Sequence, residues 1–380
     1  MKKTYTVNIL ELIYYISFSF YLILATLNTS MFSVPSGLSI LVRIILLSLI
    51  IKLVLQKKYT ISELIIYGVF VLISLLTWKS SHYANILDIC LLIISSKDIP
   101  FKNILKIYII IVSTLLVVMT ISSLSGIIPN LQYVRGDTGA IRNSLGAVYP
   151  TDYAAHVFFL FTAIAYYFAG KYNTFKIILG LVFAAFIYKL CDARLDAFSI
   201  LIIVLVIAIE KFFKNTQKLK LYKLLPFSMI IFMCVSLFFT LNYDSSSKLM
   251  STINNLFSNR LILGYQGVKK YGITLFGQSV SFNGLGGTTA TVLNYDFVDS
   301  SYIQMFIRYG IVYTLFFIAL FTFWGFSRSR KKDVISLIIF TIISLNAIVA
   351  HHLVAVEYNF LILALFSNVD SIIKIEDYKE

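Results

Sequence analysis

The chain has 380 residues, of which 59% are hydrophobic and only 13% are charged. Since a soluble globular protein carries roughly 25% charged residues, this composition excludes a soluble chain and indicates a protein solvated by lipid. The formal net charge is +14, but no basic, non-hydrophobic domain accompanies it, so we expect no nucleic-acid partner.

Apolar runs near the length that crosses a bilayer as a helix, roughly 20 residues, recur along the whole chain. They predict an all-α fold in which residues 1–380 form a single polytopic integral membrane domain. We expect about 12 transmembrane helices. The predicted spans cover residues 9–27, 37–55, 61–77, 83–96, 104–127, 152–169, 174–190, 195–213, 224–241, 301–325, 333–350 and 355–369.

The distribution of lysine predicts the orientation of these spans. With the amino terminus inside, the inner connections and the two termini hold 19 of the 24 Lys residues but only 2 of the 8 Arg residues. Cytoplasmic loops of membrane proteins carry such an excess of positive charge. We therefore expect both termini to face the cytoplasm, and we interpret the first apolar run as an uncleaved span.

Two outer segments differ from the short connections elsewhere. Residues 128–151 are expected to form a first functional loop, and residues 242–299 form a large extracytoplasmic loop between the ninth and tenth spans. In the second segment Leu249 and Ile253 belong to an apolar pattern at helical spacing, which predicts a helix on the membrane or against the bundle. The glycine-containing stretch 281–289 is expected to cover a substrate.

The arginines of the outer side suggest an anionic ligand. A guanidinium group is always charged and offers a rigid fork to two oxygens of a phosphate or carboxylate. The alternative is that these side chains pair with carboxylates such as Asp192 and Asp196, or reach toward lipid headgroups. Arg43, inside the second span, is a functional candidate by its position alone. The outer candidates are Arg135, Arg142, Arg194, Arg260 and Arg308.

The histidines and cysteines predict no metal site. The sequence contains no HExxH motif and no closely paired cysteines, and these are the usual signs of a zinc site. On a helix, the adjacent His351 and His352 would point to different sides, so that at most one could enter a shared site. No phosphate-binding loop or dinucleotide motif is present either, and we expect no cofactor.

Asp299 is the main candidate for acid–base chemistry. It opens the predicted tenth span in the sequence Asp299-Ser300-Ser301-Tyr302, where Asp and Ser are favoured as helix N-caps. A carboxylate in that position is also suited to accept a proton from a sugar hydroxyl. Glu357, at the outer end of the last span, is a second candidate base.

This arrangement resembles the Wzy-type polysaccharide polymerases and the related O-antigen ligases, which share the many spans and the two outer loops. Their ligase-type pattern is His, then Asn, Ser or Gln, nine residues, Gly, two residues, and Gly, Thr or Tyr. Asp299 and Ser300, followed after nine residues by Gly310 and then by Tyr313, fit every position except the first. Asp replaces His there, which retains a proton acceptor.

Four further segments are similar to that family in a looser way. Arg142 to Gly146, and the spacing of ten residues between Arg135 and Gly146, resemble the segment before the sixth span. Asp192-Ala193-Arg194 looks like a short outer turn that carries arginine. Asn259-Arg260 resembles the start of the large polymerase loop.

The resemblance implies a GT-C-like or O-antigen ligase-like bundle in the inner (plasma) membrane of a bacterium. It implies a metal-independent glycosyltransferase that joins undecaprenyl-pyrophosphate-linked oligosaccharide repeat units into capsular, exo- or O-antigen polysaccharide. Donor, acceptor and membrane lipid are the expected partners, together with the flippase and the chain-length regulator of the same pathway. A ligase of the same superfamily and, from a different class, a polysaccharide exporter or flippase remain alternatives.

Residue roles follow from this comparison. We expect Arg142, Arg194 and Arg260 to stabilise the departing pyrophosphate as fixed positive charge, and Asp299 to remove the proton of the acceptor hydroxyl. The residues expected to contact substrate are Arg135, Tyr302, Arg308, Glu357 and His351.

Overall fold

The computed structural model describes residues 8–56, 58–135, 138–169, 173–212, 220–290 and 292–371. Several residues used to predict the topology lie outside this described part, among them both termini, Lys57, Lys171 and the lysines between residues 213 and 219. Asp137, a further carboxylate with which the outer arginines could pair, lies outside it as well.

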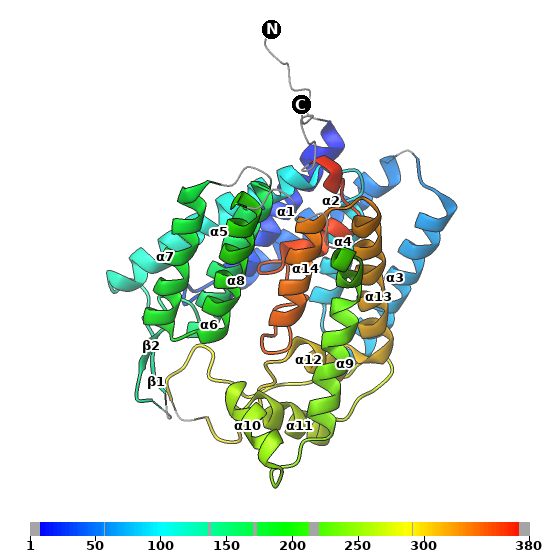
Figure 1. Cartoon of the computed structure of the whole chain (residues 1–380). Coiled ribbons are helices and arrows are strands. Elements are labelled where there is room, and N and C mark those ends of the chain that lie inside the picture. Colours follow the sequence, from blue (N-terminus) through cyan, green and yellow to red (C-terminus); the bar gives the residue numbers. More distant parts are fainter. Residues whose placement is uncertain are drawn as a thin grey trace.

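The described chain is almost entirely helical (Figure 1). Its first half contains α1 (Ile9–Asn28), α2 (Ser36–Leu55), α3 (Ile61–Ser81), α4 (Asn85–Ser95), α5 (Phe101–Leu124), β1 (Gln132–Val134), β2 (Ile141–Asn143), α6 (Pro150–Tyr167), α7 (Thr174–Cys191) and α8 (Arg194–Phe212). Its second half contains η2 (Lys220–Phe227), α9 (Ser228–Leu241), α10 (Lys248–Leu256), α11 (Arg260–Tyr271), α12 (Ser301–Arg308), α13 (Gly310–Arg330), α14 (Val334–Asn346), η3 (Phe360–Leu365) and η4 (Val369–Ser371).

The membrane character predicted from the composition is confirmed in its coarse form. Among the described residues, seven helices are long and apolar enough to cross a membrane: α1, α2, α3, α5, α7, α13 and the segment Tyr222–Leu241. The count of about 12 spans is not confirmed. Helices α4 and α14 have 11 and 13 residues, and the described residues 355–369 form no α-helix but only the short 3-10 helix η3.

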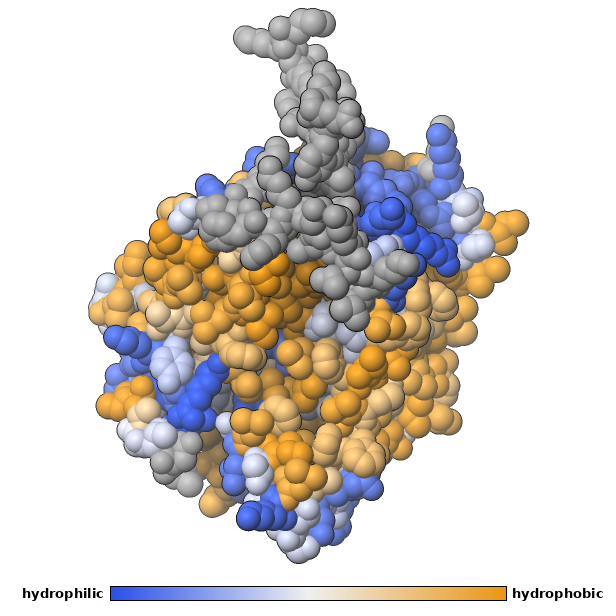
Figure 2. Space-filling view, viewed as in Figure 1, coloured by the Kyte–Doolittle hydropathy of each residue, from blue (hydrophilic) through white to orange (hydrophobic). Residues whose placement is uncertain are grey.

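The faces of the long helices that point away from the bundle are apolar. Figure 2 shows hydrophobic residues across the middle of the molecule, with hydrophilic ones gathered toward its ends. Ile44 of α2 and Ile61 of α3 are 59% and 78% exposed, and many other large apolar side chains of these helices are exposed as well. Since a soluble monomer rarely exposes such contiguous apolar surface, these faces are the surface that lipid covers.

Helix α6 forms the centre of the bundle. It begins with Pro150 at its first position, where the missing N–H costs no hydrogen bond. Of its 18 residues 15 are buried, including Phe158 and Phe161, and it packs against α5, α7 and α8. A helix that is buried all round places its first turn, with Asp152, inside the protein rather than in lipid.

The predicted tenth span is interrupted near its outer end. Helix α12 stops at Arg308, and α13 starts at Gly310, whose φ of +81° is outside the helical range. Residues 274–278 of the large loop bind the backbone groups freed by this break, since Thr274 accepts from the N–H of Ile311 and Leu275 from that of Val312. The single helix expected over residues 301–325 is therefore wrong, because the loop replaces its internal hydrogen bonds.

The two outer loops meet at one end of the bundle, opposite the first turn of α1 and η4 (Figure 1). The first loop contains the antiparallel hairpin β1–β2, which the sequence did not indicate. The Tyr133 hydroxyl of this hairpin donates to the Leu285 carbonyl at 2.9 Å or the Thr288 carbonyl at 3.0 Å, and the N–H of Gly287 donates to the Val148 carbonyl. The helix predicted around Leu249 is present as α10.

The break at Gly310 leads to a test of stability. A Cβ at Gly310 would lie 2.3 Å from the backbone nitrogen of Gly277, and its positive φ disfavours any other residue. We expect Gly310→Ala to lower the free energy of unfolding by about 2 kcal/mol or more. Thermal unfolding of the purified protein in detergent measures this.

The matched control is Gly68→Ala, in the middle of α3, where an added Cβ meets no atom within 4 Å. Alanine is favoured there by about 0.5–1 kcal/mol, so its melting temperature should be equal or higher. Equal melting temperatures for both variants would contradict the account of the break.

Candidate active site

A cavity of about 500 Å³ opens at the end of the bundle where the two outer loops meet. Helices α1, α4, α6 and α12 contribute to its wall, together with the large loop and the segment after α14. Its charged and titratable lining residues are Asp152, Asp299, Arg308, His351, His352 and Glu357, and its aromatic lining includes Tyr21, Tyr83, Tyr149, Tyr295, Phe297, Tyr309 and Tyr358. A concave site with aromatic walls and a few converging polar groups is typical of small-ligand binding.

The glycine-containing stretch of the large loop forms part of the wall of this cavity. Residues 284–286 line it, and Asp296 holds the stretch in place by accepting from the N–H of Asn283 at 2.6 Å and from the Tyr271 hydroxyl and Lys270 ammonium at 2.5 Å each. Burial acts to raise the pKa of Asp296, but these hydrogen bonds keep it below its usual value. The carboxylate therefore stays charged at neutral pH, and its hydrogen bonds connect the glycine-containing stretch to α11.

Asp299 and Arg260 form an ion pair at the wall of the cavity. Arg260 Nε lies 3.7 Å from a carboxylate oxygen of Asp299 and donates to the Val349 carbonyl at 2.6 Å. Asp299 lines the cavity, whereas Arg260 stands behind it at the start of α11. The residue at the N-cap of α12 is Ser300, so the carboxylate of Asp299 is available to Arg260 and to a ligand.

Arg308 is the arginine that lines the cavity directly. Its guanidinium group lies between the rings of Tyr83 and Phe282, 4.9 and 4.5 Å from their centroids, and it donates to the Tyr83 hydroxyl at 3.1 Å. Its Nε is buried and has no hydrogen-bond partner. The side chain as a whole lines the cavity, so the fixed charge of its guanidinium group is suited to an anionic ligand.

Arg135 and Arg194 make the structural pairing that the sequence left as an alternative. Both bind the carboxylate of Asp192 in the α7–α8 turn, at 2.7 Å and 3.2 Å respectively. Burial acts to raise the pKa of Asp192, but the two arginines hold it below its usual value. Neither arginine is among the residues that line the cavity.

Arg142 has an intermediate position. It donates to the Cys191 carbonyl at 3.1 Å and lies over the ring of Tyr149, 5.4 Å from its centroid. Burial raises the pKa of the neighbouring Tyr295, and the charge of Asp299 raises it further, whereas Arg260 and Arg142 lower it. Arg142 and Arg260 thus lie close enough to Tyr295 for their charges to act on it, whereas Arg194 pairs with Asp192.

The remaining predicted contacts divide in the same way. Glu357 and His351 line the cavity, but Tyr302 is fully buried and donates to the Ser344 carbonyl at 2.8 Å, where it presents no surface to a ligand. Glu357 also lines a second cavity of about 130 Å³. There Arg43 pairs with Asp88 at 3.4 Å, so the arginine of the second span has a local partner.

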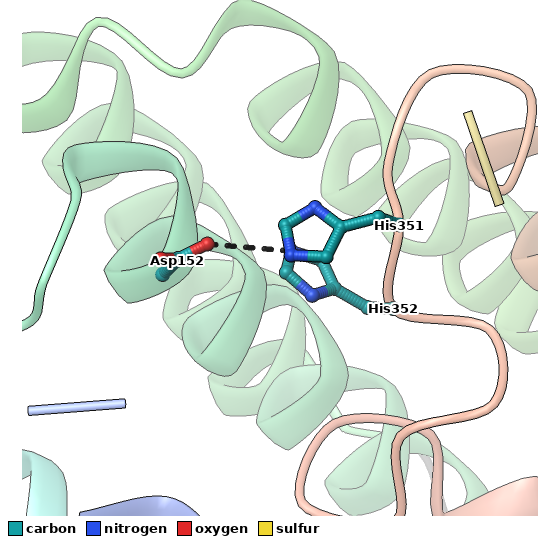
Figure 3. A group of neighbouring side chains, drawn as sticks. All are labelled: Asp152, His351 and His352. Carbon is teal, nitrogen blue, oxygen red and sulfur yellow. Dashed lines mark ion pairs between the residues drawn. The ribbon is translucent and has the colours of Figure 1, made fainter. Parts of the chain in front are cut away.

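The sequence reasoning missed Asp152 and His352. Helix α14 ends at Asn346, and His351 and His352 lie in an irregular segment beyond it, so the premise that they point to different sides of a helix is wrong. Their ring centroids are 4.1 Å apart, and both face Asp152 (Figure 3). These three residues could together hold a metal ion. A carboxylate in the first turn of an otherwise apolar helix was the available signal.

No protein-family model, curated protein or solved structure matches the chain.

The ion pairs of Asp192 with Arg135 and Arg194 predict that its contribution to stability depends on pH. A folded-state pKa held below the unfolded value stabilises the fold above that value, and the stabilisation is lost as the pH falls through the folded pKa. We expect Asp192→Asn, which tolerates the positive φ of this position, to lower the free energy of unfolding by about 1 kcal/mol at neutral pH.

Below about pH 4, the difference between variant and wild type should shrink, because the wild-type carboxylate then gains its proton. Thermal unfolding in detergent, from neutral pH to below about pH 4, measures the stability difference between variant and wild type and its decrease in acid. A difference that stays constant with pH would mean that the two arginines do not act on Asp192 as an anion.

Proposed function

We propose that the chain is a polysaccharide polymerase that joins lipid-pyrophosphate-linked oligosaccharide units on the outer face of a bacterial cell membrane. The observation that carries this proposal is the cavity between the two outer loops, whose wall combines carboxylates with Arg308 and aromatic rings. Asp299, the first residue of the ligase-type pattern, lies in that same wall. The carboxylate expected to act as the base therefore borders the cavity.

The proposed reaction forms one bond and breaks one. A hydroxyl oxygen of the acceptor unit attacks the anomeric carbon of the donor, and the bond from that carbon to the lipid pyrophosphate breaks. The hydroxyl proton passes to a carboxylate, for which Asp299 is the candidate, since its oxygens face the cavity. The donor is already activated, so no nucleotide is required.

Positive charge at the cavity wall supports departure of the pyrophosphate. Arg308 places its guanidinium charge at the wall, and Arg260 is positioned through Asp299 and the Val349 carbonyl. Fixed cations in a site that excludes water stabilise developing negative charge more than solvent does. Arg142 would contribute from behind Tyr149, and Arg194 would act on the α7–α8 turn through Asp192.

The setting of this reaction follows from the same proposal. The acceptor and donor would reach the cavity from the outer leaflet, with both termini of the chain in the cytoplasm. The flippase and the chain-length regulator of the pathway would be neighbouring partners, and membrane lipid would cover the apolar helix faces.

Two other functions, a glycan ligase and a polysaccharide exporter, are alternatives to the polymerase. A ligase would pass a finished glycan to another acceptor; Asp299, at the position where the ligase-type pattern has His, favours the polymerase. An exporter would need a polar path through the membrane, and the second cavity around Arg43 and Asp88 is the feature that favours it. Translocation of a glycan without bond formation would distinguish the exporter.

Incubation of the purified chain with a lipid-linked repeat unit, without nucleotide, should produce a ladder of products. We expect Asp299→Asn and Arg308→Gln each to reduce the rate of chain growth by about 100-fold or more, as the loss of one electrostatic contact in an active site commonly does. The same assay in the presence of a chelator tests whether the reaction is independent of metal, as the sequence predicts.

Lys248→Gln is the matched control, since it removes an exposed outer charge on α10 that is remote from the cavity lining. It should leave the ladder unchanged. Normal ladders from both cavity variants, in protein that is correctly inserted, would remove Asp299 and Arg308 from the mechanism.

A further inference from the structure

We infer that Asp152, His351 and His352 form a binding site for a divalent transition-metal ion of the zinc type in the wall of the cavity. This site goes beyond the proposed function, because its argument and its test depend on the three side chains alone.

The three side chains converge although they come from distant parts of the chain. One potential ligand atom from each lies within 4.8 Å of the other two. His352 Nε2 is 3.8 Å from a carboxylate oxygen of Asp152, and the two imidazole rings are 4.1 Å apart. Figure 3 shows the carboxylate facing the rings. Tetrahedral ligands at about 2.1 Å from zinc lie about 3.4 Å apart, so binding requires a closure of about 1 Å.

The polar atoms of this cluster lack the partners that buried groups normally have. His352 is only 3% exposed; its Nδ1 has no hydrogen-bond partner, and its Nε2 is too far from Asp152 for a hydrogen bond. Asp152 is 8% exposed, and within the described part of the chain its carboxylate accepts no hydrogen bond. Buried groups of this kind are costly unless a water molecule or an ion satisfies them. A cation bound by the carboxylate and by one nitrogen of each imidazole would satisfy Asp152 and His352 Nε2, while His352 Nδ1 would still lack a partner in the described part of the chain.

The surrounding structure holds these side chains in position. Ser301 fixes the backbone on both sides of the histidine pair, because its N–H and hydroxyl donate to the Ala350 carbonyl and its hydroxyl accepts from the N–H of Leu353. Tyr358 stacks behind His352, with 3.9 Å between the ring centroids. Asp152 lies on the buried helix α6. The histidines lie outside any helix, so their segment can close on an ion without breaking helical hydrogen bonds.

The donor set selects the class of ion. Two imidazole nitrogens and one carboxylate oxygen suit zinc and its neighbours, whereas Mg²⁺ and Ca²⁺ prefer oxygen alone. Three protein ligands leave at least one coordination position open. All three residues line the cavity, so that open position can face water or an anionic oxygen of a bound ligand.

Metal titration of the intact protein tests the site. The chain is purified in detergent without a polyhistidine tag, stripped with a chelator, and titrated with Zn²⁺ by calorimetry, with Co²⁺ as a spectroscopic probe. We expect one ion per chain. Asp152→Asn, His351→Gln and His352→Gln should each weaken binding at least tenfold.

The matched control is His82→Asn, which replaces an exposed histidine with a positive φ at the end of α3 and should leave the affinity unchanged. The inference is overturned if the wild type does not bind the ion, or if all three site variants bind it with the affinity of the wild type. Asp152 and His352 would then be an ordinary pair of polar side chains hydrated by water. If the variants fail to fold, X-ray absorption at the zinc edge of the wild-type complex decides, since fewer than two imidazole ligands overturns it. No glycan is present, so the outcome is separate from that of the polymerase assay.

Discussion

Charged and polar groups inside the protein need hydrogen-bond or ion-pair partners, and this structure depends on that constraint. Lipid offers no hydrogen bonds, so a polar group at membrane depth must find its partner in the chain. Arg43 finds Asp88 across α2 and α4, and Arg260 finds Asp299 at the outer end. The first pair joins two helices, and the second joins the start of α11 to the residue just before the N-cap of α12.

The same constraint explains where regular helix is interrupted. The backbone between α12 and α13 leaves the helical conformation at Gly310, but the large loop supplies the hydrogen bonds that the helix loses. After α14 the chain is again irregular, and Ser301 binds it on both sides of the histidine pair. Irregular backbone is tolerated at this depth where protein or a cavity surrounds it. Both interruptions border the cavity, and they bring side chains to its wall that continuous helices would point elsewhere.

The fold brings charged side chains of both signs to the wall of the cavity. Asp152, Asp299 and Glu357 line it together with Arg308, and Arg260 stands behind Asp299. In the proposed reaction, an anionic leaving group would need positive charge close by, and an acceptor hydroxyl would need a carboxylate. The wall provides both, on elements that the two outer loops hold together. A cation between Asp152 and the histidines would offset part of the negative charge of the three carboxylates.

Local patterns in the amino-acid order were enough to establish the membrane class, the long helices such as α1 and α5, and the helix α10. These features depend on composition and on the spacing of residues close in sequence, which act before any tertiary contact forms. The pairing of Arg135 and Arg194 with Asp192, the break at Gly310 and the approach of Asp152 to His352 were decided by packing. Those contacts join residues up to 200 positions apart, and no periodicity along the chain records which distant side chains a folded bundle brings together.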